Sequence, residues 1–307
     1  MLYEFALDPA AVAGWTSRAQ GRLVKEAFRI GSGRVPACVP GRWRRMGWEA
    51  LAGDDQNVRL RIGVLIGYLH ERASGRRVGT WDGAVSWLSN VLVEHAREPF
   101  HAIVTTAQKE GAPYVLCDDD LETTNKYWQV IRTRPVRRTA AGYAAAFRGL
   151  IGAARRVVIV EPVFDPQERR FTLALEAIAS LDPIASGQVT PCLIVRMDER
   201  TPTADELERR CRLYLPRHLG PNTSLDILFA EQKSGGERLH NRFIVTDVAS
   251  VLLGDSIDEG RPGETNDIAL LDEEHHRGRL AAYGNADQAF NVVRRLRLTG
   301  VVPWSGS

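Results

Sequence analysis

Apolar positions in the first 135 residues recur at the spacing of an α-helix. Between residues 54 and 74, capping-type residues are followed by apolar side chains three and four positions apart, namely Val58, Ile62, Leu65, Ile66 and Leu69. Residues 81–111 predict one or two further helices, interrupted before Pro99. Residues 31–47 are rich in Gly, Pro, Arg and Trp, which predicts a loop. The pattern indicates a mainly helical N-terminal domain over residues 1–135.

A different pattern begins at residue 139, where helical stripes alternate with short apolar runs. An amphipathic helix over residues 139–156 leads directly into a β-branched run of the kind found in buried strands. The alternation continues with predicted helices at 168–181, 203–219 and 285–298 and predicted strands at 157–164, 189–197, 224–231, 240–247 and 250–256. This order predicts a mixed α/β sheet with helices on both faces, over residues 139–307.

Charge is unevenly distributed along the chain, although the net charge is only +2 over 307 residues. Residues 18–77 contain 13 Lys or Arg and five Asp or Glu, whereas residues 247–274 contain nine acids and one arginine. Residues 126–138 carry five basic residues and no acid, and we expect them to bridge the two parts. The composition, 25% charged and 44% hydrophobic, is typical of a globular protein with a basic front and an acidic back.

The cysteines and the N-terminus indicate in which cellular compartment the protein is expected. Four cysteines, at positions 38, 117, 192 and 211, form no CxxC pair and no zinc-type spacing with histidine, which predicts free thiols. The first 15 residues carry two acids and no basic n-region, unlike a signal peptide. No apolar run approaches the length that a bilayer needs. We therefore expect a cytoplasmic protein with no metal and no other cofactor.

Candidate chemistry concentrates in residues 238–260, RLHNRFIVTDVASVLLGDSIDEG. His240 and Arg242 are two apart at the mouth of a hydrophobic strand, so on a regular strand they point to the same face. A neutral histidine can attack phosphorus, and a guanidinium fork can hold phosphate oxygens. Asp247 has the opposite pleat parity, so we expect it to cap the strand end or make structural hydrogen bonds. The pair predicts a phosphate site.

The spacing of these residues resembles a known motif. Written as a pattern, the stretch is His240-x-Arg242, four residues, Asp247, six residues, Gly254. It is similar to H-x-K-x4-D-x6-G of the phospholipase D superfamily, and the resemblance covers residues 140–307 because the preceding elements match that fold in order. It implies a mixed-sheet phospholipase D-like domain.

Three positions depart from that motif. Arg242 stands in place of the lysine, Asp255 in place of the usual serine, and Ile257 in place of the asparagine. The arginine variant also resembles the phospholipase D-like C-terminal domain of MIT-domain proteins, which binds membranes and partners. Active sites of the superfamily usually combine two histidine motifs, and this sequence carries one. The resemblance therefore implies a homodimer, or a degenerate domain that only binds.

The resemblance also implies roles for individual residues. His240 would be the nucleophile of a metal-independent phosphodiesterase, and Arg242 would clamp the phosphate. A carboxylate on the other ring nitrogen of His240 would fix its tautomer. In the family this carboxylate follows an asparagine downstream of the motif, a place that Asn266 and Asp267 occupy here, so Asp267 is the predicted orienting residue.

Ten residues make up the predicted site. The catalytic set comprises His240, Arg242, Asp267 and Asp247, and the substrate-binding set comprises Asn241, Glu161, Ser256, Asn266, Arg44 and Arg45. Glu161 follows a predicted strand, where α/β sites collect, whereas Asp165 is assigned to a turn. We expect His275 and His276 to lie on a solvated helix face.

Nucleic acid is the favoured substrate class, DNA or RNA, ahead of lipid. The basic N-terminal part interleaves arginines with tryptophans that could stack on bases, although core positions are commoner for this residue type: Trp43, Trp48, Trp81, Trp87 and Trp128. Stand-alone domains of this resemblance often belong to DNA-processing or anti-phage systems. The first hypothesis is therefore a nuclease of phospholipase D type.

Two alternatives stay open. One is a catalytically inactive module whose His240–Arg242 pocket binds nucleic acid, a lipid head group or a partner protein; the three departures from the motif favour it. The other is a subunit that docks onto a larger complex through its N-terminal helices. Loss of cleavage on His240→Ala would identify the enzyme, whereas a binding module would depend mainly on Arg242.

Overall fold

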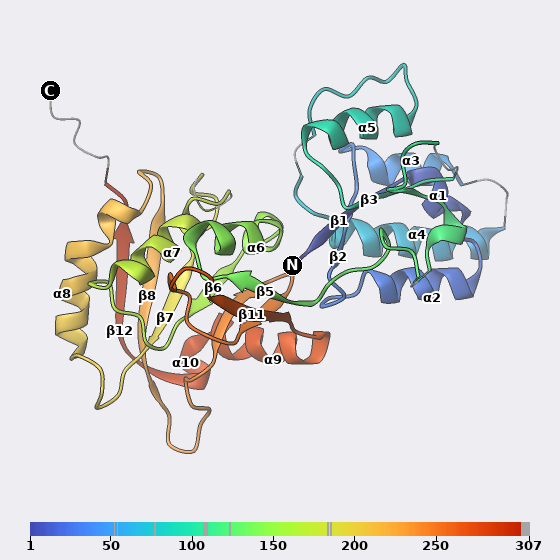
Figure 1. The fold of residues 1–307 in the computed structure, drawn as a ribbon. Helices are drawn as coiled ribbons and strands as arrows, with labels where there is room; N and C mark the ends of the chain where they lie inside the picture. The colour runs from blue at the N-terminus through green and yellow to red at the C-terminus, as the bar shows by residue number, and fades with distance from the viewer. Residues whose placement is uncertain are drawn as a thin grey trace, which may run out of the picture. The chain divides into compact units, whose positions relative to one another are not determined.

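The structure is a computed structural model that describes residues 1–301, except positions 52, 54, 77, 107–109, 123, 183 and 185. Two of the charged positions counted above, 54 and 77, and the end of the predicted second domain, 302–307, lie outside the described residues. The chain divides into two compact units (Figure 1): residues 2–131, and residues 132–307 together with Met1.

The first unit contains a four-stranded parallel sheet, with the strand order β2-β1-β3-β4. The strands are β1 (Tyr3–Leu7), β2 (Arg34–Ala37), β3 (Ala102–Val104) and β4 (Val115–Leu116). The helices are α1 (Pro9–Gly14), α2 (Arg18–Ala27), α3 (Trp43–Glu49), α4 (Gln56–Glu71) and α5 (Trp87–Arg97), and a 3-10 turn, η1, covers Asp118–Asp120.

Helices were predicted for this unit and the sheet was not. The apolar stripe of α4 is buried as the spacing predicted, and α5 ends just before Glu98 and Pro99. The strands β3 and β4 could not be recognised in the sequence because they are very short and buried on both faces. They therefore show no alternation of apolar and polar residues. Residues 102–104, which seemed to continue a helix, instead pair with β1.

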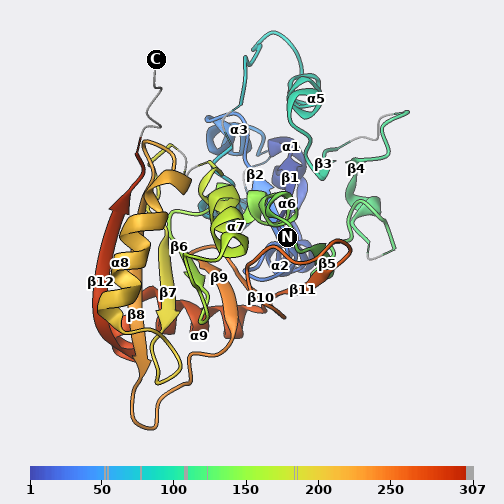
Figure 2. The same ribbon diagram turned by 60° about the vertical axis from the view of Figure 1, so that its left-hand side comes forward.

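The second unit contains an eight-stranded mixed sheet, with the order β12-β8-β7-β6-β9-β10-β11-β5 (Figure 2). The strands are β5 (Thr133–Arg137), β6 (Val157–Val160), β7 (Cys192–Arg196), β8 (Ser224–Gln232), β9 (Arg242–Thr246), β10 (Ser250–Leu253), β11 (Thr265–Leu270) and β12 (Phe290–Thr299). The helices are α6 (Ala140–Gly152), α7 (Arg169–Ala179), α8 (Ala204–Tyr214), α9 (Glu273–Gly284) and α10 (Ala286–Ala289), with a 3-10 turn, η2, at Pro216–His218.

This sheet confirms the predicted mixed α/β class. Strands β6, β7 and β8 run parallel at its centre, and β9, β10, β11, β5 and β12 join by antiparallel pairing. Val160 and Phe243 pack with Tyr283 of α9 on one face. The other face carries α6, whose Tyr143 hydroxyl receives a hydrogen bond from Asn266 of β11. Helices therefore cover both faces, as alternating helices and strands require.

Two segments differ from the sequence-based expectation. Residues 126–138 were expected to bridge two parts, and the boundary between the two units, after residue 131, falls within them. Residues 133–137 were not expected to be a strand, but they form β5, the edge strand that pairs with β11. Residues 290–299, expected to continue a final helix, form β12 and pair with β8. Toward both ends of this strand every second residue is buried or partly buried, including Val292, Leu296 and Leu298, and this is the period of a strand rather than of a helix.

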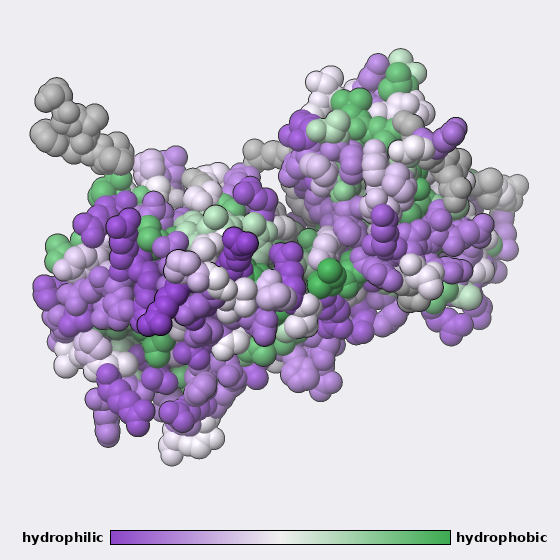
Figure 3. All heavy atoms as spheres, in the orientation of Figure 1, coloured by the Kyte–Doolittle hydropathy of each residue, from purple (hydrophilic) through white to green (hydrophobic). Residues whose placement is uncertain are grey.

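The surface and the thiols add two observations. Figure 3 shows hydrophilic side chains over most of the visible face of each unit, with scattered hydrophobic ones between them. The four cysteines carry free thiols, and Cys211 is buried. No helix in the described ranges combines the length and the apolar character that crossing a membrane requires.

His276 corrects an expectation about the helix α9. His275 is exposed and bonds Asp272, but His276 is 1% exposed, and its Nδ1 lies 2.8 Å from the Ser250 hydroxyl of β10. The two neighbours differ because helical residues one apart face different directions. Burial lowers the pKa of His276, since the charged imidazolium loses its hydration.

We expect this buried imidazole to make stability depend on pH. Below its ordinary pKa the unfolded chain takes up a proton that the folded chain resists, so the free energy of unfolding falls as the pH drops from 6.5, by up to about 1.4 kcal/mol per pH unit. In His276→Gln, urea unfolding between pH 7.5 and 5 should show a shallower pH dependence than the wild type, whereas the exposed-neighbour variant His275→Gln keeps the steeper one. Equal slopes for the wild type and His276→Gln would refute this role.

Candidate active site

His240 and Arg242 lie at the amino end of β9, although only Arg242 belongs to the strand. His240 sits in the turn that precedes it, and its side chain is exposed. In the described part of the chain, no hydrogen bond or ion pair engages the imidazole of His240. Asn241, between them, is exposed as well. The turn therefore exposes the side chains of His240 and Asn241 to solvent, immediately before Arg242 begins the strand.

Arg242 faces a buried carboxylate on the neighbouring strand. β6 and β9 are antiparallel with Val160 opposite Phe243, which places Glu161, the next residue, beside Arg242. Arg242 Nε lies 3.8 Å from Glu161 Oε1, and among the described residues this buried Nε has no hydrogen-bond partner. Glu161 is 1% exposed. The structure thus brings together two of the predicted site residues, one cationic and one anionic.

The carboxylate of Glu161 is held by hydrogen bonds from two loops. Its Oε2 accepts from the Ile257 backbone N–H at 2.7 Å, and its Oε1 accepts from the Val163 N–H at 3.3 Å and the Ser256 hydroxyl at 3.4 Å. Burial raises the pKa of Glu161, while the Ile257 N–H and the Arg242 guanidinium act in the opposite direction. Glu161 therefore ties the loop after β10 to the carboxyl end of β6.

Asn266 organises the same loop from the other side. Its Oδ1 accepts from the Asp255 N–H at 2.9 Å, and its Nδ2 donates to the carbonyls of Asp255 and Ser256 and to the Tyr143 hydroxyl. Gly254 starts the loop where a Cβ would lie 3.2 Å from the Asp267 carbonyl oxygen, so a side chain at this motif position would crowd β11. Asn266 and the glycine are thus loop-forming residues.

An ion-pair cluster closes the loop, and the sequence interpretation missed it. Asp258 is fully buried between Arg138 Nη2, 2.5 Å from its Oδ1, and Arg170 Nη1, 2.9 Å from its Oδ2. Arg138 also pairs with Asp255 Oδ2 at 2.7 Å. The sequence did contain a signal, because acidic residues follow Gly254 and arginines are numerous elsewhere in the chain. The arginine partners of Asp258 are more than 80 residues away from it, however, and residue spacing cannot identify such pairs.

The register places Asp267 on the face of the sheet opposite to Arg242. Residues opposite each other in an antiparallel pair point to the same face, and Arg242 lies opposite Leu253, which lies opposite Ile268. Asp267 is adjacent to Ile268, so it points to the other face, and β11 is two strands or roughly 10 Å from β9. No hydrogen bond or ion pair joins Asp267 to His240 among the described residues. The orienting role of Asp267 therefore stays a prediction, and no interaction in the described part of the chain supports it.

Asp247 lies at the end of β9 that is remote from Arg242. Its Oδ1 accepts hydrogen bonds from the backbone N–H groups of Arg155 and Arg156, at 2.9 and 3.1 Å, just before β6 begins. It lies five residue steps along the strand from Arg242, roughly 16 Å. Asp247 thus joins two strand ends, and the structure keeps it apart from the histidine and the arginine.

Arg44 and Arg45, the other predicted contacts, belong to α3 in the first unit. Arg45 Nε pairs with Glu49 at 2.6 Å, and Arg44 has no hydrogen-bond or ion-pair partner in the described ranges. Within the part of the chain that the structure covers, no three His, Cys, Asp or Glu side chains gather where they could hold a metal ion.

Comparison with known proteins gives structural matches alone. No family model and no curated protein matches the chain. NucT from Helicobacter pylori matches with 14% identity and a TM-score of 0.34, over 52% of this chain and 96% of that one. Nuc from Salmonella typhimurium, a phospholipase D family member, matches with 12% identity and a TM-score of 0.30, over 50% and 88%. TrmBL2, an archaeal chromatin protein, matches with 8% identity and a TM-score of 0.28, over 56% and 57%.

We expect adjacent residues of β11 to differ sharply in their effect on stability. Asn266→Ala leaves buried backbone groups of the 254–257 loop without partners and should lower the free energy of unfolding by about 2–4 kcal/mol. Asp267→Ala, at the exposed neighbour, should change it by less than about 0.5 kcal/mol. Urea denaturation measures the difference, and amide hydrogen exchange at Asp255 and Ile257 localises it. Similar losses in both variants would contradict this assignment.

Proposed function

We propose that the chain is a metal-independent phosphodiesterase of phospholipase D type that cleaves nucleic acid. The observation that carries the proposal is the exposed His240 immediately before Arg242, whose terminal Nη groups make no hydrogen bond among the described residues, at one strand end. Free guanidinium Nη groups and a free imidazole suit a phosphodiester, because one group can hold the phosphate oxygens while the other attacks phosphorus.

The chemistry would proceed in two displacements. A ring nitrogen of His240 forms a bond to phosphorus, the ester P–O bond breaks, and the leaving oxygen takes a proton. Water then attacks the phosphohistidine and gives a proton back to the group that protonated the leaving oxygen, the P–N bond breaks, and the imidazole is restored. Arg242 holds the non-bridging oxygens throughout, and Glu161 keeps its guanidinium in place from the side away from solvent.

A second copy of the chain would complete the site. His240 lacks an orienting carboxylate in the described part of its own chain, and the sequence carries one histidine motif. We propose that two copies place their His240 side chains on one phosphate, so that one attacks while the other protonates the leaving oxygen. Membership of a DNA-processing or anti-phage system, suggested by the resemblance, remains part of this proposal, as does a cytoplasmic location.

A second candidate function is a binding module without turnover. The observation that favours it is the pairing of Arg242 with Glu161, which places a carboxylate where it repels an anionic phosphate. Together with Asp255 and Ile257 in place of the family's serine and asparagine, this pairing suits weak recognition of a phosphate better than stabilisation of a transition state.

The first experiment is cleavage of labelled single- and double-stranded DNA and RNA in EDTA. We expect the wild type to cleave at least one of them and His240→Ala to lose about 10³-fold or more, because the attacking nitrogen is gone. Arg242→Gln should lose about 10²–10³-fold through lost charge stabilisation, whereas Arg242→Lys keeps part of the activity. Arg148→Gln, an exposed arginine of α6, is the matched control.

Activity that survives in His240→Ala would point to another site and overturn the proposal. Absence of cleavage in the wild type, with probe binding that depends on Arg242, would establish the binding module instead.

The proposed two-copy site predicts a concentration dependence. Cleavage per chain should rise with protein concentration, and light scattering should report a dimer over the same range, because a monomer holds half of the site. Mixing His240→Ala with wild type should reduce activity by more than the fraction of mutant chains. A monomer with full activity at all concentrations would exclude the shared site.

A further inference from the structure

The structure separates one tryptophan of the first unit from the others that the sequence suggested for base stacking. Trp43, Trp87 and Trp128 are buried in its cores, and Trp81 is partly buried. Trp48, on α3, is 38% exposed. Aromatic side chains stack on bases only where a face or edge of the ring is accessible, so Trp48 is the candidate among these five.

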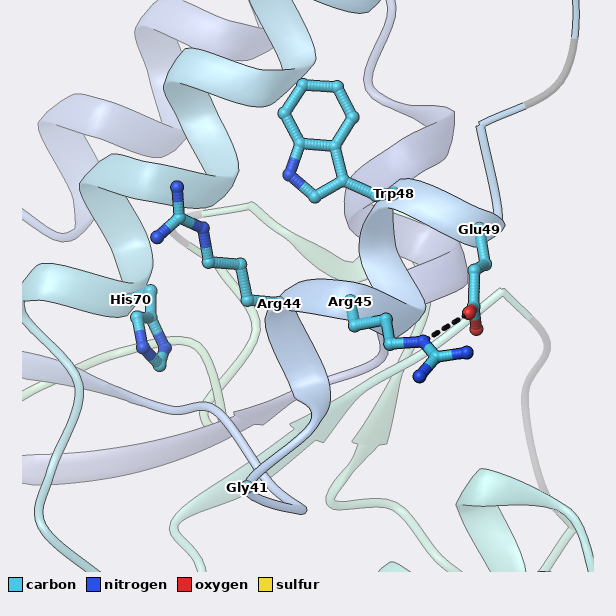
Figure 4. Close-up of a pocket in the computed structure, with 6 residues that line it drawn as sticks. All are labelled: Gly41, Arg44, Arg45, Trp48, Glu49 and His70. Atoms are coloured by element: carbon cyan, nitrogen blue, oxygen red, sulfur yellow. Dashed lines mark hydrogen bonds and ion pairs between the residues drawn. The ribbon is translucent and has the colours of Figure 1, made fainter.

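Trp48 lines a shallow hollow between α3 and the end of α4 (Figure 4). The hollow has a volume of about 650 Å³ and is lined by Gly41, Arg44, Arg45, Trp48, Glu49 and His70. All six residues belong to the first unit. Figure 4 shows the Arg44 side chain extending toward α4, between the indole of Trp48 and the imidazole of His70. The hollow therefore offers an aromatic ring beside nitrogen groups.

The indole of Trp48 is held in place by close packing on α4. A Cβ added at Gly63 would lie 2.3 Å from the indole Cη2 and 2.6 Å from Cζ2, so the ring lies directly against the glycine backbone. A ring held in this way loses little conformational freedom when a flat ligand stacks on it. Gly63 thus provides the close approach that fixes the ring.

One arginine of the hollow has an ion-pair partner and the other has none among the described residues. Arg45 forms an ion pair with Glu49 across one helical turn. Arg44 is exposed and has no ion pair or hydrogen bond within the described ranges. Its guanidinium therefore remains available for an anion, with the exposed His70 beside it.

We propose that this hollow binds an unpaired nucleotide of a nucleic-acid strand, with its base on Trp48 and its phosphate on Arg44 and His70. An aromatic face next to a free guanidinium fits a base linked to a phosphate, whereas the bases of a duplex are already stacked on one another. The proposal rests on the proposed function for the class of substrate and assigns that substrate a single-stranded segment. Its geometry lies wholly within residues 2–131.

Binding can be tested without cleavage, in the full chain carrying His240→Ala and in EDTA. Fluorescence anisotropy with labelled single strands of DNA and of RNA should show Trp48→Leu about tenfold weaker than its parent, and Trp48→Phe much closer to it. Arg44→Gln should weaken binding severalfold and reduce the salt dependence by about one phosphate contact. Arg22→Gln, an exposed arginine of α2 outside the hollow, is the charge-matched control and should have a small effect.

A third variant moves the ring without removing a contacting group. Gly63→Ala introduces a methyl group against the indole, so it should displace Trp48 and weaken single-strand binding while the fold is retained. Circular dichroism checks the fold, and the change in tryptophan fluorescence on binding should disappear in Trp48→Phe. A loss confined to DNA or to RNA supports the proposal and names the strand.

Two outcomes would overturn the proposal. One is single-strand binding that is unchanged in Trp48→Leu. The other is an equal loss in Arg44→Gln and Arg22→Gln, which would assign binding to general surface charge. Because cleavage is measured separately with His240 intact, failure of this site and failure of the nuclease proposal are distinguishable.

Discussion

The buried carboxylate of Glu161 is the constraint on which the candidate site depends. A carboxylate removed from water at the end of a central strand must find donors, since burial without partners costs several kcal/mol. It finds them in the N–H groups of Ile257 and Val163 and the hydroxyl of Ser256, and the guanidinium of Arg242, 3.8 Å away, adds an opposite charge. Satisfying one charge therefore fixes both the loop after β10 and the arginine that begins β9. The position of Arg242 is therefore tied to the solvation of an internal carboxylate.

The distance between Glu161 and Arg242 lets the guanidinium be held in position and still be available to a ligand. A guanidinium without a fixed counter-charge would swing into solvent, whereas one bonded tightly on all its N–H groups would have none left for a ligand. At 3.8 Å, Glu161 attracts Arg242 without capturing its Nε in a hydrogen bond. Its Nη groups make no hydrogen bond among the described residues, so the arginine is oriented and keeps donors that suit an oxyanion.

Much of the second unit could be predicted from the sequence, and the failures there have a common origin. Alternation along a single strand located β9 and set Asp247 apart from the pair of His240 and Arg242. The face on which Asp267 lies could not be predicted, because it depends on the register between strands, which a sequence pattern does not contain. His276 and the sheet of the first unit were missed for a related reason: burial there comes from neighbours distant in the sequence.

The place of β5 in the sheet has a consequence for how the chain assembles. β5 begins the second unit in the sequence, yet its partner β11 is made more than 120 residues later. During synthesis the parallel strands β6, β7 and β8 can pair in the order in which they emerge. The backbone N–H and C=O groups of β5 stay unpaired until β11 has been made. Pairings across such separations form slowly, because a long loop must close before they contribute. The nascent chain thus carries an unpaired strand near its middle until the edge of the sheet is closed.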